Sequence, residues 1–169
     1  VGLYHIENLT PEAKEQGEAL IKEGAQVYVI DDAELERVKA SYPIIWKNKD
    51  AKPELCFIGC PHVSVQQLKD WTDAIEEKLR ANGLSKVTVP TVFTAAPAVI
   101  KALEGTVYLD KLATYGVVVS YICPLMYMNN PLCKKKAVIT CSNKLRTYTS
   151  ARYYTEAEIL DIITGKEGK

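Results

Sequence analysis

The sequence lacks the features that would direct it to a nucleic acid or a membrane. Basic and acidic residues are balanced, 21 of each, so the formal net charge is zero and no electrostatic argument favours a polyanionic partner. No apolar run approaches the roughly 20 residues that a membrane-spanning helix needs. We therefore expect a domain that binds neither nucleic acid nor membrane.

Several motifs with well-defined chemistry are also missing. The chain contains neither the GxGxxG pattern of dinucleotide-binding folds nor the GxxxxGK[ST] pattern of a P-loop. It has no GxSxG pattern, which excludes the usual nucleophile turn of an α/β-hydrolase. It has only two histidines and no CxxC pair, so we expect no histidine-rich metal site, zinc ribbon or thioredoxin-type site.

Five cysteines are present, and this odd number lacks the dense spacing of small disulfide-bonded secreted domains. We interpret them as free thiols of a protein in a reducing, cytoplasmic setting. Cys56 lies inside an apolar run and is predicted to belong to the core, whereas Cys133 precedes a lysine run and is predicted to be an ordinary free thiol.

Strand-like and helix-like patterns alternate along the whole chain. The clearest helix is predicted over residues 65–79, where apolar residues recur at spacings of three and four, and Ser64 with Gln67 matches a capping box at its start. Such alternation is typical of a mostly parallel sheet covered on both faces, so we predict a three-layer α/β/α fold and a single α/β domain over residues 1–169. Other helices are predicted to begin at Pro11, Asp31, Pro97, Val107 and Thr155, and strands to cover 26–30, 55–58, 87–93, 117–120 and 137–140.

Two of these predicted strands end in a similar corner. Cys60 follows strand 55–58 and Cys123 follows strand 117–120, and each precedes a proline that fixes the turn. If both strands belong to one parallel sheet, both thiols lie at its carboxyl edge, where open α/β sheets bind ligands. A lone cysteine usually packs as a small apolar residue, but two equivalent corners favour a metal or cluster site. Cys141 ends a third predicted strand and is a candidate third ligand.

Polar residues follow the same strand ends. His62, just after the first corner, could bind a substrate oxygen or move a proton. Ser64 begins a helix whose free N–H groups suit a carboxylate or phosphate. A polar turn that also suits an anion follows the last strand, although such turns are often merely exposed. The turn consists of Ser142, Asn143 and Lys144.

Several of these motifs occur in the order found in the aconitase X family of hydro-lyases. They are Thr-Pro-Glu-Ala at 10–13, Gly-Cys-Pro-His at 59–62 followed by Ser64, the Cys123 corner, and Ser142 with Lys144. The chain resembles a C-terminal part of that family's large subunit. The resemblance implies an aconitase-like domain, a fragment of a larger catalytic subunit.

The resemblance also implies an iron–sulfur cluster held by three cysteines, with one iron acting as a Lewis acid on the departing hydroxyl of a small hydroxy acid. Cys60 and Cys123 would be two ligands, and the third would be Cys141 or a residue of the missing portion. Ser142 and Lys144 would face the substrate. The remainder of the large subunit and a small swivelling domain or subunit, which supplies the base, would complete the site, so we expect this chain to be inactive alone.

Two other readings of the residues stay open. A non-catalytic scaffold or binding domain could hold a small anion in a strand-end pocket, and it would contain no iron. A cysteine-nucleophile enzyme could use Cys60 with His62, but such pairs usually come from distant segments. For a fragment of a larger subunit we also expect an exposed apolar face, around residues 126–128.

Overall fold

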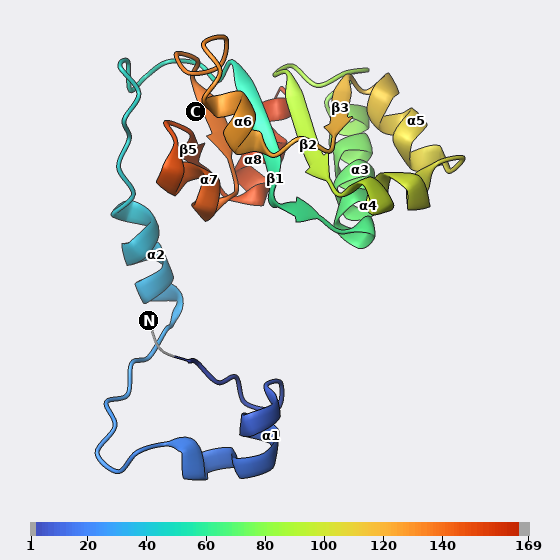
Figure 1. Ribbon diagram of the computed structural model, residues 1–169. Helices are drawn as coiled ribbons and strands as arrows, with labels where there is room; N and C mark the ends of the chain where they lie inside the picture. Colours follow the sequence, from blue (N-terminus) through green and yellow to red (C-terminus); the bar gives the residue numbers. More distant parts are fainter. Residues whose placement is uncertain (1–2, 166–169) are drawn as a thin grey trace. The chain divides into compact units, whose positions relative to one another are not determined.

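The chain divides into two compact units, Val1–Ser41 and Tyr42–Lys169. The structure, a computed structural model, describes residues 3–165 (Figure 1). Among these residues, no helix is both long and apolar enough to cross a membrane.

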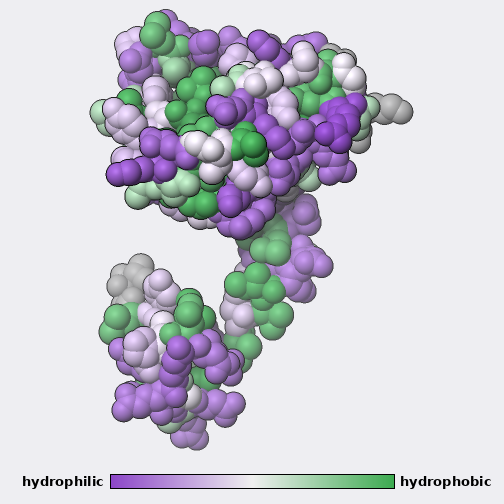
Figure 2. Space-filling model, turned by 90° about the vertical axis from the view of Figure 1, so that its right-hand side faces the viewer, coloured by the Kyte–Doolittle hydropathy of each residue, from purple (hydrophilic) through white to green (hydrophobic). Residues whose placement is uncertain are grey.

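The first unit contains two short helices, α1 (Pro11–Gln16) and α2 (Asp32–Ala40), with a 3₁₀ turn (Gly17–Leu20) after α1. Asp31 caps α2 by accepting a hydrogen bond from the backbone N–H of Glu34 (2.8 Å), as its position predicts. The strand predicted over 26–30 is not formed, and Val27 is 88% exposed. None of residues 3–41 is buried, and hydrophobic side chains stand at the surface of this unit (Figure 2).

The second unit is built on a five-stranded sheet in the order β3-β2-β1-β4-β5. Every neighbouring pair of strands is parallel, so all carboxyl ends meet at one edge. The strands are β1 (Leu55–Val63), β2 (Thr91–Ala95), β3 (Val117–Ser120), β4 (Val138–Thr140) and β5 (Arg152–Tyr153).

Helices cover both faces of this sheet, which confirms the predicted three-layer α/β/α fold (Figure 1). One face packs against α3 (Val65–Ala81), α4 (Pro97–Leu103), α5 (Val107–Thr114) and α8 (Glu156–Ile163). The other face packs against the short helices α6 (Pro124–Met128) and α7 (Asn143–Tyr148). Two apolar clusters fill the space between the sheet and these helices. The α3-side cluster includes Cys56, Ile58, Leu68, Trp71 and Phe93. The α6-side cluster includes Phe57, Cys60, Met128, Val138 and Leu145.

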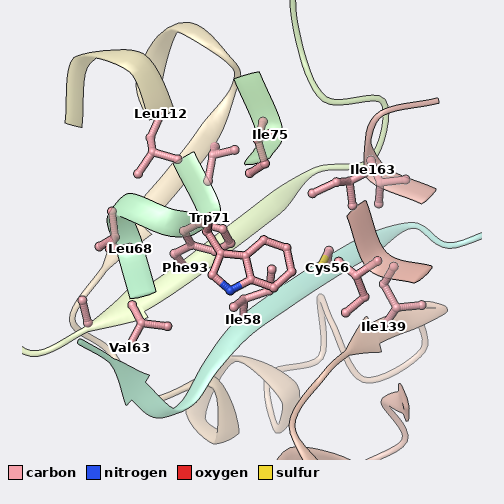
Figure 3. Packing of buried hydrophobic residues seen from close by; sticks show 14 of the residues in the cluster. Cys56, Ile58, Val63, Leu68, Trp71, Ile75, Phe93, Leu112, Ile139 and Ile163 are labelled. Atoms are coloured by element: carbon pink, nitrogen blue, oxygen red, sulfur yellow. The ribbon is translucent and has the colours of Figure 1, made fainter. Parts of the chain in front are cut away.

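The α3-side cluster is the larger core, and its centre follows the predicted stripe of α3. Leu68, Trp71 and Ile75 are buried against β1 and β2, where Trp71 meets Phe93 edge-on (Figure 3). Burying each such side chain stabilises the fold by about 1.5–3 kcal/mol. The predicted capping box between Ser64 and Gln67 is present at the start of α3.

Three local predictions were wrong. The strand predicted over 87–93 was thought to be an edge or bent strand because of Pro90. The observed strand β2 begins after Pro90 and lies between β3 and β1, so it is not an edge strand. The carbonyl of Pro90 accepts a hydrogen bond from the N–H of Cys56 (2.8 Å). Residues 125–132, predicted to be a loop, include most of α6. The polar turn after β4 continues into α7, and β5 follows it.

Candidate functional site

Two of the three predicted thiol ligands lie at the carboxyl edge of the sheet. Cys60 lies near the end of β1, and Cys123 lies just after β3. The strands are separated by β2, but because all three run parallel both thiols come to the same edge. The edge is the place where α/β sheets bind ligands.

A break in the alternation of β1 decides the face on which Cys60 lies. Cys56 and Ile58 join the α3-side cluster, whereas Phe57 joins the α6-side cluster. Regular alternation would place Cys60 with the first pair, yet it packs in the α6-side cluster and is 7% exposed. The change occurs at Gly59, whose φ of +112° is accessible to glycine and strained for other residues.

The main chain at this corner is held by two buried hydroxyl groups. Thr94 of β2 donates from Oγ1 to the carbonyl of Gly59 (2.5 Å). Ser142 donates from Oγ to the carbonyl of Cys60, and the same oxygen accepts from the N–H of Leu145 (3.0 Å) as the N-cap of α7. The peptide bond between Cys60 and Pro61 is cis.

Cys123 is the N-cap residue of α6, and α6 packs on the cluster that contains Cys60. Tyr127 of α6 stacks on Phe57 with ring centres 5.5 Å apart, and its hydroxyl lies 2.8 Å from the hydroxyl of Ser120. These contacts bind the end of β3 to the face on which Cys60 lies. The two cysteines therefore share an edge of the sheet, and the helix that Cys123 caps packs on the cluster that contains Cys60.

Cys141 lies elsewhere, because its side chain packs against the α3-side cluster. Burial raises the pKa of its thiol to about 11, which disfavours the thiolate that binds metals. Cys56 is fully buried on the same side, and burial raises its thiol pKa well above the usual value. Within residues 3–165, no three His, Cys, Asp or Glu side chains gather in a way that could hold a metal ion. This part of the chain does not provide a complete three-cysteine site.

The predicted polar residues lie near the same edge in different settings. His62 and Lys144 are exposed. Ser64 uses its hydroxyl to accept from the N–H of Gln67 (3.1 Å), and Asn143 accepts from the Nε of Arg146 (2.9 Å). Their binding roles stay predictions, as does that of Ser142, whose buried hydroxyl is engaged with the Cys60 carbonyl and the Leu145 N–H.

Sequence reasoning missed Thr94, Arg146 and the second hydrogen bond of Ser142. No local signal could have indicated Thr94, because its contact with Gly59 depends on β1 lying beside β2.

Of the three residues thought to form an exposed apolar face, only Met126 is strongly exposed (68%), while Met128 is buried.

A cavity lies at the opposite, amino edge of the sheet. It has a volume of about 580 Å³ and is lined by Glu54 and Ala137, which directly precede β1 and β4. Trp46 lies in its wall and donates from its indole N–H to the carbonyl of Ser150 (2.9 Å). Four lysines also line it: Lys47, Lys134, Lys135 and Lys136.

Two proteins named phosphomevalonate dehydratase large subunit are similar to this chain. That of Thermococcus kodakarensis is 29% identical over 116 residues, which make up 69% of this chain and 27% of the relative. That of Methanosarcina mazei is 32% identical over 78 residues, which make up 46% of this chain and 17% of the relative. The chain thus spans only a minor part of the length of these dehydratase subunits.

The solved structure of Thermococcus kodakaraensis aconitase X in its holo-form is similar in fold, with a TM-score of 0.60 at 21% identity. The similarity covers 84% of this chain and 35% of that one. The family described as the aconitase X third domain matches residues 53–163, which contain the whole sheet and both thiol corners. The chain therefore belongs to the aconitase X family, and its residues 53–163 correspond to the third domain of that family.

Proposed function

We propose that this chain forms part of the large subunit of an aconitase X hydro-lyase, which removes water from a small hydroxy acid. In such a reaction a hydroxyl group leaves one carbon, a proton leaves the neighbouring carbon, and a double bond forms between them. The observation that carries the proposal is that the Cys60 and Cys123 corners lie at the same edge of a third-domain fold, with α6, which Cys123 caps, packed on the cluster that contains Cys60. The names of both relatives, which are dehydratase subunits, support it.

Cys60 and Cys123 are proposed as two ligands of an iron–sulfur cluster. Cys60 fits this role because the break at Gly59 brings it to the layer of α6, which Cys123 begins. Cys141 does not fit, because it packs on the other side of the sheet with a raised thiol pKa. The third ligand is then supplied from outside residues 3–165. When bound, such a cluster supplies Lewis acidity toward a hydroxyl group.

The contribution of the chain itself to catalysis is proposed to be substrate binding. Lys144 is exposed in the first turn of α7 and offers a positive charge to an anionic group. His62 and the start of α3 offer further N–H donors; because the capping box uses the N–H groups of Ser64 and Gln67, the proposed backbone donors are those of Val65 and Gln66. No base is assigned among residues 3–165, so the base is proposed to come from another part of the enzyme.

The proposal is tested on the complete enzyme, with the full large subunit and its small subunit, by measuring dehydration of phosphomevalonate. Cys60→Ser is expected to lower kcat at least 100-fold, and Lys144→Ala to raise KM about tenfold. Cys133→Ser, a change at a partly exposed cysteine that packs against the same α6-side cluster as Cys60, serves as the control and should retain full activity. Failure to dehydrate phosphomevalonate or any other small hydroxy acid would overturn the proposal.

A second candidate function is favoured by the cavity at the amino edge. Its volume of about 580 Å³ falls within the range of small-molecule sites, and its lining includes four lysines and one carboxylate, that of Glu54. Glu54 already accepts a hydrogen bond from the N–H of Ala137 (2.9 Å). This arrangement suits a small anion, although at the edge opposite to the predicted strand-end pocket.

Calorimetric titration of the chain with inorganic pyrophosphate tests this candidate. Binding that weakens at least tenfold in Lys134→Glu/Lys136→Glu, and that is unchanged in Lys101→Glu on the distant α4, would support it. Absence of binding, or equal weakening in both variants, would remove it without affecting the hydro-lyase proposal.

A further inference from the structure

We propose that Thr94 and Ser142 are positioning residues that together fix the direction of the Cys60 thiol. This inference rests on the proposed role of Cys60 as a ligand. Neither side chain needs to touch a cluster or substrate, because each acts on the main chain of the corner. We call the two hydrogen bonds the hydroxyl clamp.

The clamp occupies two successive carbonyl groups from two directions. The hydroxyl of Thr94 comes from β2 on one side of β1 and reaches the carbonyl of Gly59. The hydroxyl of Ser142 follows β4 on the other side of β1 and reaches the carbonyl of Cys60. Thr94 is fully buried and Ser142 is 7% exposed, so water competes little with either bond.

The corner needs such bonds because the strand ladder is interrupted there. The β1–β2 register runs to Ile58 opposite Phe93 and resumes at Val63 opposite Ala95. Five steps along β1 therefore face two steps along β2, and the carbonyls between them lie outside the regular pattern. Hydroxyl groups take the place of the missing backbone donors, as buried carbonyl groups require.

Close packing restricts the corner further. A Cβ atom built on Gly59 would lie 2.6 Å from Oγ1 of Thr94 and also meet the Thr94 backbone. The clamp is thus in direct contact with the residue whose positive φ turns Cys60 toward the α6-side cluster. Loss of either hydroxyl would leave a buried carbonyl of the corner without its donor, so the main chain at Gly59 and Cys60 would open more often and expose the Cys60 thiol to solvent.

The first test uses the full chain without added metal. Thr94→Val keeps the shape of the side chain and removes its donor, while Ser142→Ala removes the other. We expect each variant to raise the rate of Cys60 alkylation by iodoacetamide about tenfold or more, measured by peptide mass mapping, with Cys133 changed less than twofold. Thr94→Ser, which keeps the hydroxyl, should restore the slow rate.

Two matched controls separate positioning from general loss of stability. Thr91→Val removes a buried hydroxyl in the same strand that donates to Val89 (2.8 Å), away from the corner. Thr155→Ala removes the N-cap of α8, as Ser142→Ala removes that of α7. If these controls speed Cys60 alkylation as much as the clamp variants do, the clamp is not a positioning device and the inference is overturned.

The second test is the iron content of the complete large subunit made without oxygen. Thr94→Val should reduce iron per protein at least threefold, whereas Thr94→Ser and Thr91→Val should leave it unchanged. Iron that is unaffected by Thr94→Val, in a wild type that contains iron, contradicts the inference. A wild type without iron whose Cys60 alkylation still depends on Thr94 would instead overturn the proposed cluster and leave the clamp standing.

Discussion

Single residues at the end of β1 determine where the candidate site lies. A one-residue change of alternation moves a side chain from one face of a sheet to the other. Gly59 makes this change, and without it Cys60 would lie in the α3-side cluster with Ile58. The site therefore depends on the backbone conformation of one glycine as much as on the cysteine itself.

Gly59→Ala is expected to reduce the free energy of unfolding by about 3 kcal/mol or more, because it combines a strained φ with a collision against Thr94. Gly83→Ala is the control, since Gly83 also has a positive φ (+68°) but nothing within 4 Å of its Cβ position. That change should cost only about 1 kcal/mol. Urea unfolding measures both, and equal costs would show that the close contact at Gly59 is unimportant.

Burial of the Cys141 thiol is expected to make the fold less stable at alkaline pH. Its thiol pKa is raised from 9.0 to about 11 in the folded chain because burial disfavours the thiolate. The unfolded chain therefore loses this proton first, so the contribution is fully present below pH 9 and is lost between about pH 9 and 11. Unfolding free energies measured across this range should decline less in Cys141→Ala than in the wild type. An equal decline in the two would show that the thiol is not desolvated.

The sequence was most informative where a signal is local. Cys60 and Cys123 were proposed as ligands from strand ends followed by proline, and the capping box of Ser64 was predicted correctly, because each pattern spans a few adjacent residues. The face on which Cys141 lies and the partner of Thr94 could not be predicted, since both depend on which strands are neighbours.

At the scale of elements, the short helix α6 joins the two thiol corners. It was predicted to be a loop, because its five residues are too few for a clear helical period. Its position comes from tertiary contacts, chiefly the stacking of Tyr127 on Phe57 and the contact between the hydroxyls of Tyr127 and Ser120. Long elements such as α3 were predicted well because their apolar stripe is repeated over several turns.

A double-mutant cycle with Phe57→Leu and Tyr127→Leu should measure a coupling of about 0.5–1.5 kcal/mol in unfolding free energy, as expected for stacked aromatic rings. Phe57 with Tyr154, which packs on the other side of the sheet, is the control pair and should show a coupling near zero. If the coupling between Phe57 and Tyr127 is also near zero, then this contact does not hold α6 on β1.

At the scale of the whole chain, the two units differ in how much apolar surface they bury. Residues 42–165 contain two buried clusters, whereas none of residues 3–41 is buried. The first unit contains the Thr-Pro-Glu-Ala sequence at residues 10–13, and it precedes residues 53–163, which match the third domain of the family. Apolar side chains such as Val27 and Leu3 are left at its surface.

Hydrogen exchange followed by mass spectrometry should separate the two units. Amides of residues 3–41 are expected to exchange within seconds to minutes, because their few hydrogen bonds are not covered by packed side chains. Amides of β1 and β2 should be the slowest of the chain, since they lie in the centre of the sheet. Comparable protection in both regions would contradict this account.

The central claim is that Cys60 and Cys123 hold iron together at the carboxyl edge of this sheet. Iron and acid-labile sulfide should therefore be measured in the complete large subunit purified without oxygen, beside single cysteine-to-serine variants. We predict iron and sulfide in the wild type, in Cys141→Ser and in Cys133→Ser, and their loss in both Cys60→Ser and Cys123→Ser. A wild type without iron, or full iron in both of the last two variants, would contradict the claim.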